Sequence, residues 1–224
     1  MSTGLTPGGL EPPRDCPLCP RLVDFRLHQR QHHPDWHNAP VPTLGRDARL
    51  LVVGLAPGLQ GANRTGRPFT GDWAGDLLYE TLDRFGFSEG VYDERPDDGL
   101  VLHGAAITNA VRCVPPANKP TGPEIATCRR FLAATIGAAE HLQAIVALGR
   151  IAHESVVRAL DLKLSAVPFG HGRRHAARLL SGRPVTLFDS YHCSRYNTNT
   201  GVLTTEMFHA VFGQVRAELD RAER

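Results

Sequence analysis

The chain has 224 residues, of which 42% are hydrophobic, and its formal net charge is +2 at pH 7. This length is typical of a single domain with a sizeable core, and the charge excludes a basic field spread over the whole molecule. Residues 1–15 are rich in Gly and Pro and lack a signal-peptide pattern, and no apolar run reaches the length of a membrane span. We therefore expect a cytoplasmic protein with a flexible segment over residues 1–15 and one domain over residues 16–224.

Four cysteines are the first candidate site along the chain. Cys16 and Cys19 form a C-x2-C pair, and Cys113 and Cys128 follow with fourteen residues between them. Disulfides are not expected in a cytosolic protein, so the spacing predicts metal ligation. Zinc and an iron–sulfur cluster both accept four thiolates, although the long second spacing fits a cluster better than paired zinc knuckles. Four unligated buried cysteines are the remaining alternative.

Apolar runs and helical patterns alternate through the rest of the chain. The runs lack polar alternation, as do strands that are buried on both faces, and they cover Leu50–Gly54, Ala105–Asn109, Ala144–Leu148 and Val185–Asp189. Helical patterns cover residues 72–85, 122–142, 150–162 and 203–219. This alternation predicts an α/β fold, a three-layer α/β/α arrangement with a central four-stranded parallel sheet.

Ligands of such folds bind beyond the carboxyl ends of the strands, so the residues that follow each run are the next candidates. The first run leads into the glycine-rich stretch "GLAPGLQGANRTGRPFTGD", which contains Phe69 and Asp72. This stretch lacks the Gly-Lys-Ser/Thr ending that holds a nucleotide triphosphate with magnesium. The second run ends at Asn109, and the fourth leads into "SYHCSRYNTNTG", which contains His192. The sequence predicts that these side chains meet at one edge of the sheet.

Each of these residues also has an ordinary structural interpretation. Phe69 either packs in the core or stacks on a planar ligand. Asp72 either caps the following helix or supplies a carboxylate that activates water. Asn109 either bonds to nearby backbone or reads the edge of a base with its amide. His192 is either a structural histidine or a hydrogen-bond donor to the oxygen of a leaving group.

Two polar segments near the C-terminal end have similar alternatives. The stretch "SRYNTNTG" is either a solvated turn or a loop whose hydroxyls and backbone N–H groups hold DNA phosphates. The basic segment at residues 171–183 is either a solvated surface or a further contact to DNA phosphates.

Together these segments resemble the uracil-DNA glycosylase superfamily, in the iron–sulfur branch that is called family five or type b. The resemblance is carried by "GLAPG", "GANRTGRPFTGD", "ITNAVRC", "HCSRYNTNTG" and the four cysteines, between residues 16 and 201. One departure is Cys193, which stands where the family generally has Pro. It predicts a looser loop and an exposed thiol near the site.

The resemblance implies a monofunctional DNA-repair enzyme, associated with the nucleoid through its substrate. It would flip uracil, or another deaminated base such as hypoxanthine or xanthine, out of DNA and hydrolyse the N-glycosidic bond to leave an abasic site. The implied catalytic residues are Asp72, which positions water and favours the sugar cation, and His192, which stabilises the leaving base.

The resemblance also implies the remaining site residues and the cofactor. The residues implied to bind the base are Ala56, Pro57, Gly58, Phe69 and Asn109. The residues implied to contact DNA are Ser194, Arg195 and Asn197. Four cysteines would hold a structural iron–sulfur cluster, expected to be 4Fe-4S: Cys16, Cys19, Cys113 and Cys128. Catalysis would need no magnesium.

Two other functions remain open at this point. A nucleotide-binding hydrolase would place a phosphate at the start of a helix, and the missing lysine argues against it. A non-catalytic binder of damaged DNA would keep the base pocket without hydrolysis, and the presence of both Asp72 and His192 argues against that function.

Overall fold

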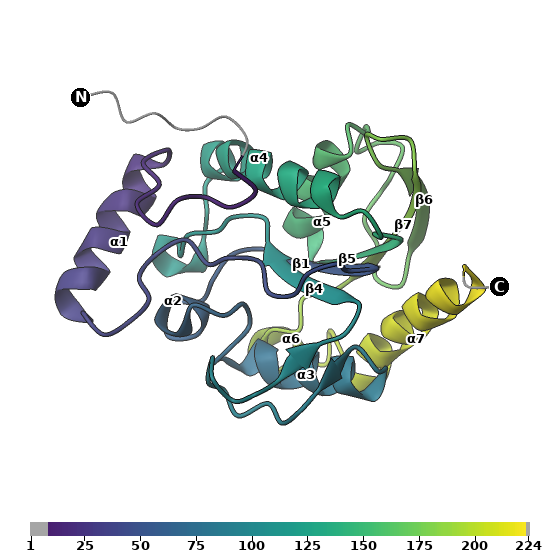
Figure 1. Cartoon of the computed structure of the whole chain (residues 1–224), viewed down its shortest axis with the longest axis horizontal. Coiled ribbons are helices and arrows are strands. Elements are labelled where there is room, and N and C mark those ends of the chain that lie inside the picture. Colours follow the sequence, from purple (N-terminus) through teal and green to yellow (C-terminus); the bar gives the residue numbers. More distant parts are fainter. Residues whose placement is uncertain (1–8, 223–224) are drawn as a thin grey trace.

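The computed structural model of the chain describes residues 9–222 (Figure 1). Residues 1–8 of the segment that we expected to be flexible therefore lie outside the described residues. In the part of that segment that is described, Glu11 accepts a hydrogen bond from the buried guanidinium of Arg112 and another from the backbone N–H of Thr43. No helix within residues 9–222 is long and apolar enough to cross a membrane.

A five-stranded sheet forms the centre of the molecule. Its strands lie in the order β4 (Ala105–Asn109), β1 (Leu50–Gly54), β5 (Ala144–Leu148), β7 (Pro184–Ser190) and β6 (Arg174–Arg178). The first four are mutually parallel, which confirms the predicted parallel strands. The predicted number of strands was wrong by one, because β6 adds an antiparallel edge to β7.

The edge strand β6 has no apolar run by which the sequence could reveal it. Its residues alternate between exposed and half-buried, and arginines stand at both of its ends. An edge strand has a neighbour on one side only, so charged side chains are tolerated there and protect the edge from pairing with another chain. We had interpreted this stretch as a basic surface segment.

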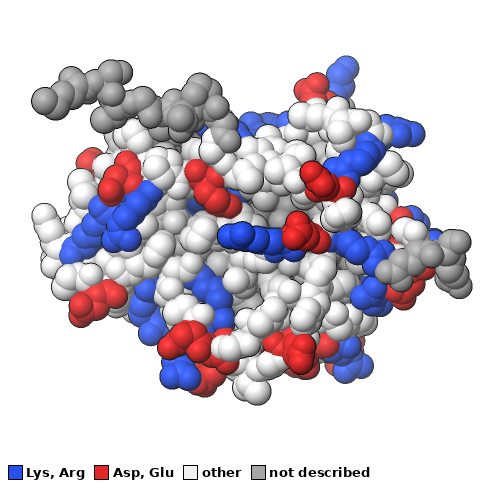
Figure 2. Space-filling model, in the orientation of Figure 1, with Lys and Arg blue, Asp and Glu red and all other residues white. Residues whose placement is uncertain are grey.

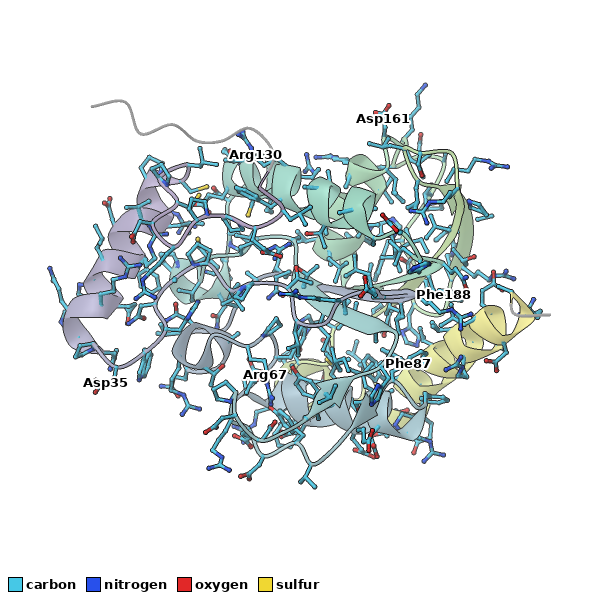
Figure 3. All side chains as sticks on the ribbon, in the orientation of Figure 1. Asp35, Arg67, Phe87, Arg130, Asp161 and Phe188 are labelled. Carbon is cyan, nitrogen blue, oxygen red and sulfur yellow. The ribbon has the colours of Figure 1, made fainter. Side chains whose placement is uncertain are left out.

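Helices cover both faces of the sheet, which confirms the three layers (Figure 1). α3 (Trp73–Arg84) and α7 (Thr205–Arg221) pack on one face, and α4 (Gly122–Ala138) and α5 (Arg150–Ala159) pack on the other. Phe87 and Phe188, labelled in Figure 3, belong to the core beside α3 and α7. All four helices were predicted from their apolar patterns.

The remaining elements lie around this core. They are α1 (Pro20–His32), α2 (Ala62–Thr65), β2 (Ser88–Glu89), β3 (Val101–Leu102), the 3-10 helix η1 (Pro116–Asn118) and α6 (Arg195–Asn199). α1 was not predicted, because it lacks an apolar stripe and buries only Leu22, Arg26 and Gln29. Its partners are the segments that carry the cysteines.

The carboxyl ends of the parallel strands meet at one edge. Gly54 of β1 pairs with Asn109 of β4, and Leu148 of β5 pairs with Ser190 of β7. The loops after β1, β4 and β7 therefore start side by side, as parallel strands require. This edge is where the predicted site residues gather.

Candidate functional site

A pocket of about 410 Å³ opens at this edge of the sheet. It contains every residue that we predicted to be catalytic or to bind the base, together with two of the three predicted to contact DNA. The lining residues are Leu55, Ala56, Pro57, Gly58, Ala62, Phe69, Asp72, Trp73, Ala74, Asn109, Asn118, His192, Ser194 and Arg195. Segments far apart in the sequence thus form one concave site, the usual form of a small-ligand site.

Phe69 forms one wall of the pocket in a strained backbone conformation. Its φ is 54°, in the left-handed region that a bulky residue rarely adopts, and its side chain is buried. The hydroxyl of Tyr92 donates to the carbonyl of Phe69, and the hydroxyl of Tyr79 donates to the carbonyl of Pro68. Such strain costs on the order of 1–3 kcal/mol and persists where the surroundings fix it, commonly at functional sites.

Asn109 ends β4 with its side chain in the pocket wall. The residue is only 3% exposed, yet its amide makes no hydrogen bond to any other described residue. Buried amides are normally paired, so this group is available for a ligand. A Cβ atom on Gly54 would lie 2.5 Å from Oδ1 of Asn109 and 2.6 Å from Cζ of Phe69. Glycine at this position lets both side chains converge.

Asp72 caps α3 and also lines the pocket, so its catalytic role stays a prediction. Its Oδ1 accepts a hydrogen bond of 3.2 Å from the backbone N–H of Ala74 and caps α3, while the carboxylate also lines the pocket. Burial raises the pKa of Asp72, and the backbone N–H groups of Gly75 and Ala74 partly oppose this rise. A Cβ atom on Gly61 would lie 2.4 Å from Oδ2 of Asp72, so the glycine-rich loop approaches the carboxylate closely.

His192 lies opposite the glycine-rich loop. Its ring is 5.9 Å from that of Phe69 between centroids, at an interplanar angle of 25°. Burial lowers the pKa of His192 to about 4. The imidazole is therefore neutral near pH 7 and has one N–H to donate. Asn197 lies outside the pocket lining and donates from Nδ2 to the carbonyl of His192 at 2.8 Å, so it braces this loop.

Five lining residues were not predicted, and two of them, Trp73 and Asn118, have polar side-chain groups; the other three are Leu55, Ala62 and Ala74. Trp73 lies in a predicted helix, yet the residue is 47% exposed. Its Nε1–H donates to Thr198, and the guanidinium of Arg195 lies 5.5 Å from the ring centroid. Asn118 has a φ of 56°. In the sequence, Asn118 is marked only by the proline pair that precedes it, and such a pair does not indicate that a residue lines a pocket.

The expected exposed thiol at Cys193 was wrong. Cys193 is completely buried in the core, and its Sγ lies 3.4 Å from the carbonyl of Ala74 at the start of α3. Burial raises the pKa of this thiol, so it is an unreactive packing residue. The sequence could not reveal this contact, because Cys193 and Ala74 are 119 residues apart.

The four remaining cysteines converge on one small cavity between α1, α4 and the loop after β4. The cysteines that line this cavity are Cys16, Cys19, Cys113 and Cys128. Leu22, Arg26 and Phe131 line it as well. Burial raises the pKa of Cys113 to about 12 and that of Cys128 to about 11. Without a cation these thiols would stay protonated, whereas a bound metal deprotonates a coordinating thiol.

The surroundings of these cysteines fit an anionic thiolate group. Arg26 is 2% exposed, and its Nη1 lies 3.7 Å from Sγ of Cys113 while its Nε has no hydrogen-bond partner. The backbone N–H of Arg112 donates to Sγ of Cys128 at 3.3 Å. Buried cations are normally paired, so Arg26 is suited to a negatively charged neighbour. Hydrogen bonds to sulfur are also a feature of iron–sulfur sites.

Sulfur spacing bears on the type of metal site. A single tetrahedral zinc ion with Zn–S bonds of about 2.3 Å needs sulfur atoms about 3.8 Å apart. Within residues 9–222, no three cysteine sulfurs lie within 4.8 Å of one another. This spacing is wider than one tetrahedral zinc ion requires, and the type of metal site stays a prediction.

The face of the molecule shown in Figure 2 does not carry one dominant charge. Figure 2 shows basic and acidic side chains interspersed on the displayed face. In the basic segment, Arg174 pairs with Glu218 of α7, and Arg173 and Arg178 are exposed. These observations suit a solvated strand, and a contact of this segment to DNA stays a prediction.

Comparison with known proteins identifies the family. The model described as the uracil DNA glycosylase superfamily matches residues 42–216. The chain belongs to this superfamily. It is 45% identical over 208 residues to the type-5 uracil-DNA glycosylase of Thermus thermophilus, covering 90% of this chain and 92% of the relative. The type-5 enzyme of Pyrobaculum aerophilum is 37% identical over 209 residues, covering 91% and 89%.

A relative from the type-4 branch is more distant. The type-4 uracil-DNA glycosylase of Pyrobaculum aerophilum is 31% identical over 144 residues, which cover 64% of this chain and 65% of the relative. The type-5 matches are longer and more similar, which supports the branch that the sequence motifs indicated. The superfamily match spans β1 through most of α7, so it includes every loop of the pocket.

Proposed function

We propose that the chain is a type-5 uracil-DNA glycosylase that removes uracil from DNA and leaves an abasic site. The observation that carries this proposal is the pocket itself, where the unpaired amide of Asn109 lies beside Phe69, Asp72 and His192. Removing one base from a duplex requires the nucleotide to leave the stack, at a cost of roughly a few kcal/mol. A concave pocket with an aromatic wall and an amide compensates that cost by stacking and hydrogen bonding.

Base recognition is assigned to Asn109 and Phe69. Deamination converts the amine of cytosine or adenine into a carbonyl and places a hydrogen on the adjacent ring nitrogen. An amide offers a donor to that carbonyl and an acceptor to that N–H. Uracil and hypoxanthine share this edge, as does xanthine, so we propose that the pocket accepts deaminated purines as well as uracil. Ala56, Pro57 and Gly58 also line the pocket, and their backbone groups are assigned to contact the base.

Bond cleavage is assigned to His192 and Asp72. As the N-glycosidic bond breaks, positive charge develops on the sugar and negative charge on the base, much as in glycoside hydrolysis. The neutral imidazole of His192 donates to the base oxygen that gains charge, an electrostatic stabilisation of the leaving group. The carboxylate of Asp72 favours the sugar cation and positions the water that attacks it. No step needs magnesium.

The DNA strand and the metal site complete the proposal. Ser194 and Arg195 contact the DNA backbone beside the flipped nucleotide, while Asn197 braces their loop through the carbonyl of His192. The four cysteines hold an iron–sulfur cluster, proposed to be 4Fe-4S, whose role is to join the N-terminal segment to α4 within one domain over residues 16–224. Thiolate ligation of this kind suits the reducing cytoplasm, where nucleoid DNA is the substrate.

The test is single-turnover hydrolysis of a duplex that contains one uracil, without added magnesium. Asp72→Asn removes the charge and keeps the shape, so we expect the rate of base release to fall by about 10²- to 10⁴-fold. Affinity for DNA with an abasic site should stay within a few-fold of wild type. The matched control is Asp76→Asn, because Asp76 lies in the same helical turn but is exposed and outside the pocket.

The outcomes separate the competing functions. If Asp72→Asn kept the wild-type rate, Asp72 would have no place in the mechanism. A wild-type chain that binds abasic DNA without releasing any base would be a non-catalytic binder. Magnesium-dependent turnover of free nucleotides would indicate a nucleotide hydrolase instead.

A further inference from the structure

A second group of titratable side chains lies outside the pocket, where α5, β6 and β7 meet. His153, His175 and Asp189 bring their nitrogen and oxygen atoms within 4.8 Å of one another. Asp189 is completely buried, His153 is 1% exposed, and His175 is half-buried. The proposed mechanism uses none of these residues, so the buried charge requires another explanation.

The hydrogen bonds define where the protons lie. Nδ1 of His153 lies 2.6 Å from Oδ1 of Asp189, and Nε2 lies 2.8 Å from the carbonyl of Val167. A carbonyl oxygen only accepts, so Nε2 must carry a hydrogen, and the 2.6 Å contact also requires a proton between nitrogen and carboxylate. The other carboxylate oxygen accepts from the backbone N–H of Gly170 and faces Nε2 of His175. This arrangement fits an imidazolium paired with a carboxylate.

A metal ion is a poorer occupant of the same position. Two histidines and one carboxylate ligate several metals, but each ligand atom must then point at a centre about 2 Å away. Here the side chains point at one another, with separations of 2.6 Å and 3.1 Å between nitrogen and oxygen. Each oxygen of Asp189 already faces at least one donor. A proton therefore accounts for the geometry.

Backbone contacts connect this pair to His192. His153 lies in the first turn of α5, and its N–H donates to the carbonyl of Gly149, whose own N–H donates to the carbonyl of Ser190. Asp189 directly precedes Ser190 on β7. A Cβ atom on Gly149 would lie 3.5 Å from Cβ of His192, which is ordinary contact distance. The pair thus links α5 to β7 close to the loop that carries His192.

Other charged and titratable groups surround His153 from each neighbouring element. Asp189 faces it from β7, His175 from β6 and Glu154 from α5 itself. The ring of Phe169 packs edge-on against it, with the guanidinium of Arg150 on the same ring. Burial alone lowers the pKa of His153, but its hydrogen bond to Asp189 raises the pKa above the ordinary value. Removing this proton therefore requires a higher pH than it would for an exposed histidine.

We propose that His153 and Asp189 are positioning residues for His192, and that the proton between them holds α5 and β7 in the arrangement that presents the His192 ring to the base. This inference rests on the proposed glycosylase function and adds two residues to it. Neither residue touches the substrate. Their effect reaches the reaction through Gly149, Ser190 and the loop that carries His192.

The first test is NMR of the histidine rings in the full chain as purified, together with its metal content. His153→Gln assigns the His153 signals by their loss. We expect both ring nitrogens of His153 to be protonated at pH 7, and the His192 ring signals to move in His153→Gln. A neutral His153 ring, unmoved His192 signals, or one equivalent of a second metal that is lost in His153→Gln would each overturn the proposal.

The second test is single-turnover base release as a function of pH. We expect His153→Gln to lower the rate about 10- to 100-fold, as a displaced catalytic group does, with abasic-DNA affinity within twofold of wild type. The wild-type rate should fall at alkaline pH as His153 loses its proton, and His153→Gln should lack this fall. The control is His103→Gln, because His103 pairs with Glu89 on the exposed β2–β3 hairpin and should behave as wild type.

Folding failure is covered by a second variant. If Asp189→Asn does not fold, the double variant His153→Gln/Asp189→Asn is used, because it replaces the ion pair by two neutral amides. This double variant should fold, but it should not recover the wild-type rate of base release. A His153→Gln protein with the wild-type rate and alkaline fall contradicts the positioning role. If the wild-type chain releases no base, the proposed function fails, while the NMR signals still decide whether the pair holds its proton and orders His192.

Discussion

Phe69, Asp72, Asn109 and His192 illustrate which properties of a residue are written in the sequence. Their residue types and their places after predicted strands indicated the pocket, because the carboxyl ends of parallel strands share one edge. The strained φ of Phe69 was not predictable, since it depends on tyrosines that approach from α3 and the following loop. The hydrogen-bond partners of buried groups were also not predictable where those partners are distant in sequence.

Gly61→Ala tests how closely the glycine-rich loop must approach Asp72. The new Cβ would lie 2.4 Å from the carboxylate oxygen, so either the loop or the carboxylate must move. We expect the single-turnover rate to fall about 10²-fold, because a displacement of about 1 Å at a reacting group has that effect. Gly137→Ala is the control, since a Cβ there meets nothing within 4 Å. Equal rates for both variants would contradict the account.

The pH dependence of base release on the acid side should follow Asp72. Burial raises the pKa of this carboxyl group above its ordinary 3.8, so the active ionised form is lost at a higher pH than for an exposed aspartate. His192 has a pKa of about 4 and is already neutral above that pH. We expect the rate to decline with falling pH with a midpoint above 3.8, measured where circular dichroism shows an intact fold. A rate that increases with acidity would mean that His192 acts as imidazolium.

At the scale of elements, predictability follows from how each element is buried. The parallel strands and the four helices that cover the sheet were predicted, because burial leaves continuous apolar runs or one-sided stripes in the sequence. β6 and α1 were missed for the opposite reason, since an edge strand and a polar helix carry arginines where an apolar pattern would be. α1 is held instead by specific contacts, such as the ion pair between Arg21 and Glu124 of α4.

The ion pair between Arg67 and Asp98 connects the glycine-rich loop to the segment before β3. Nη1 and Nη2 of Arg67 donate to the carboxylate of Asp98 at 2.7 and 2.6 Å. Both side chains are almost completely buried (Arg67 is labelled in Figure 3). The guanidinium also lies within 6 Å of the rings of Tyr79 and Tyr92. The loop that carries Phe69 is therefore anchored at its base.

Asp98→Asn should lower the free energy of unfolding by about 3–5 kcal/mol, because it leaves a buried guanidinium without its counter-ion. Arg67 holds the pKa of Asp98 well below its ordinary 3.8. The ion pair therefore stabilises the fold fully above pH 3.8, and this stabilisation is lost as the pH falls through the lowered pKa of Asp98. Urea titration at pH 7 measures the loss. Asp93→Asn, which breaks an exposed pair with Arg95, should cost less than about 1 kcal/mol, and equal losses would contradict this account.

At the scale of the whole molecule, the cysteine cavity joins distant parts of the chain. Cys16 and Cys19 precede α1, Cys113 follows β4, and Cys128 lies within α4. The loop after β4 begins at Asn109 in the pocket and reaches Cys113 four residues later. The spacing of the cysteines predicted their convergence, whereas the buried position of Arg26 beside them appears only in the folded chain.

Cys128→Ser should remove the visible absorption of the proposed iron–sulfur cluster and lower the melting temperature, because metal binding contributes to folding stability. Cys193→Ala is the control, because Cys193 lies in a different part of the core and should leave the absorption unchanged. Absorption spectra, iron and sulfide content and a thermal melt measure these effects. An unchanged spectrum and melting temperature in Cys128→Ser would contradict the cluster assignment.

The most direct measurement of the central claim is the identity of the product released by the wild-type chain. A duplex with one radiolabelled uracil is incubated under single-turnover conditions without magnesium, and the products are separated by chromatography. The account predicts free uracil and an intact strand that breaks at the abasic site only after alkali. Release of a nucleotide, direct strand cleavage, or no product from folded protein that binds abasic DNA would contradict it.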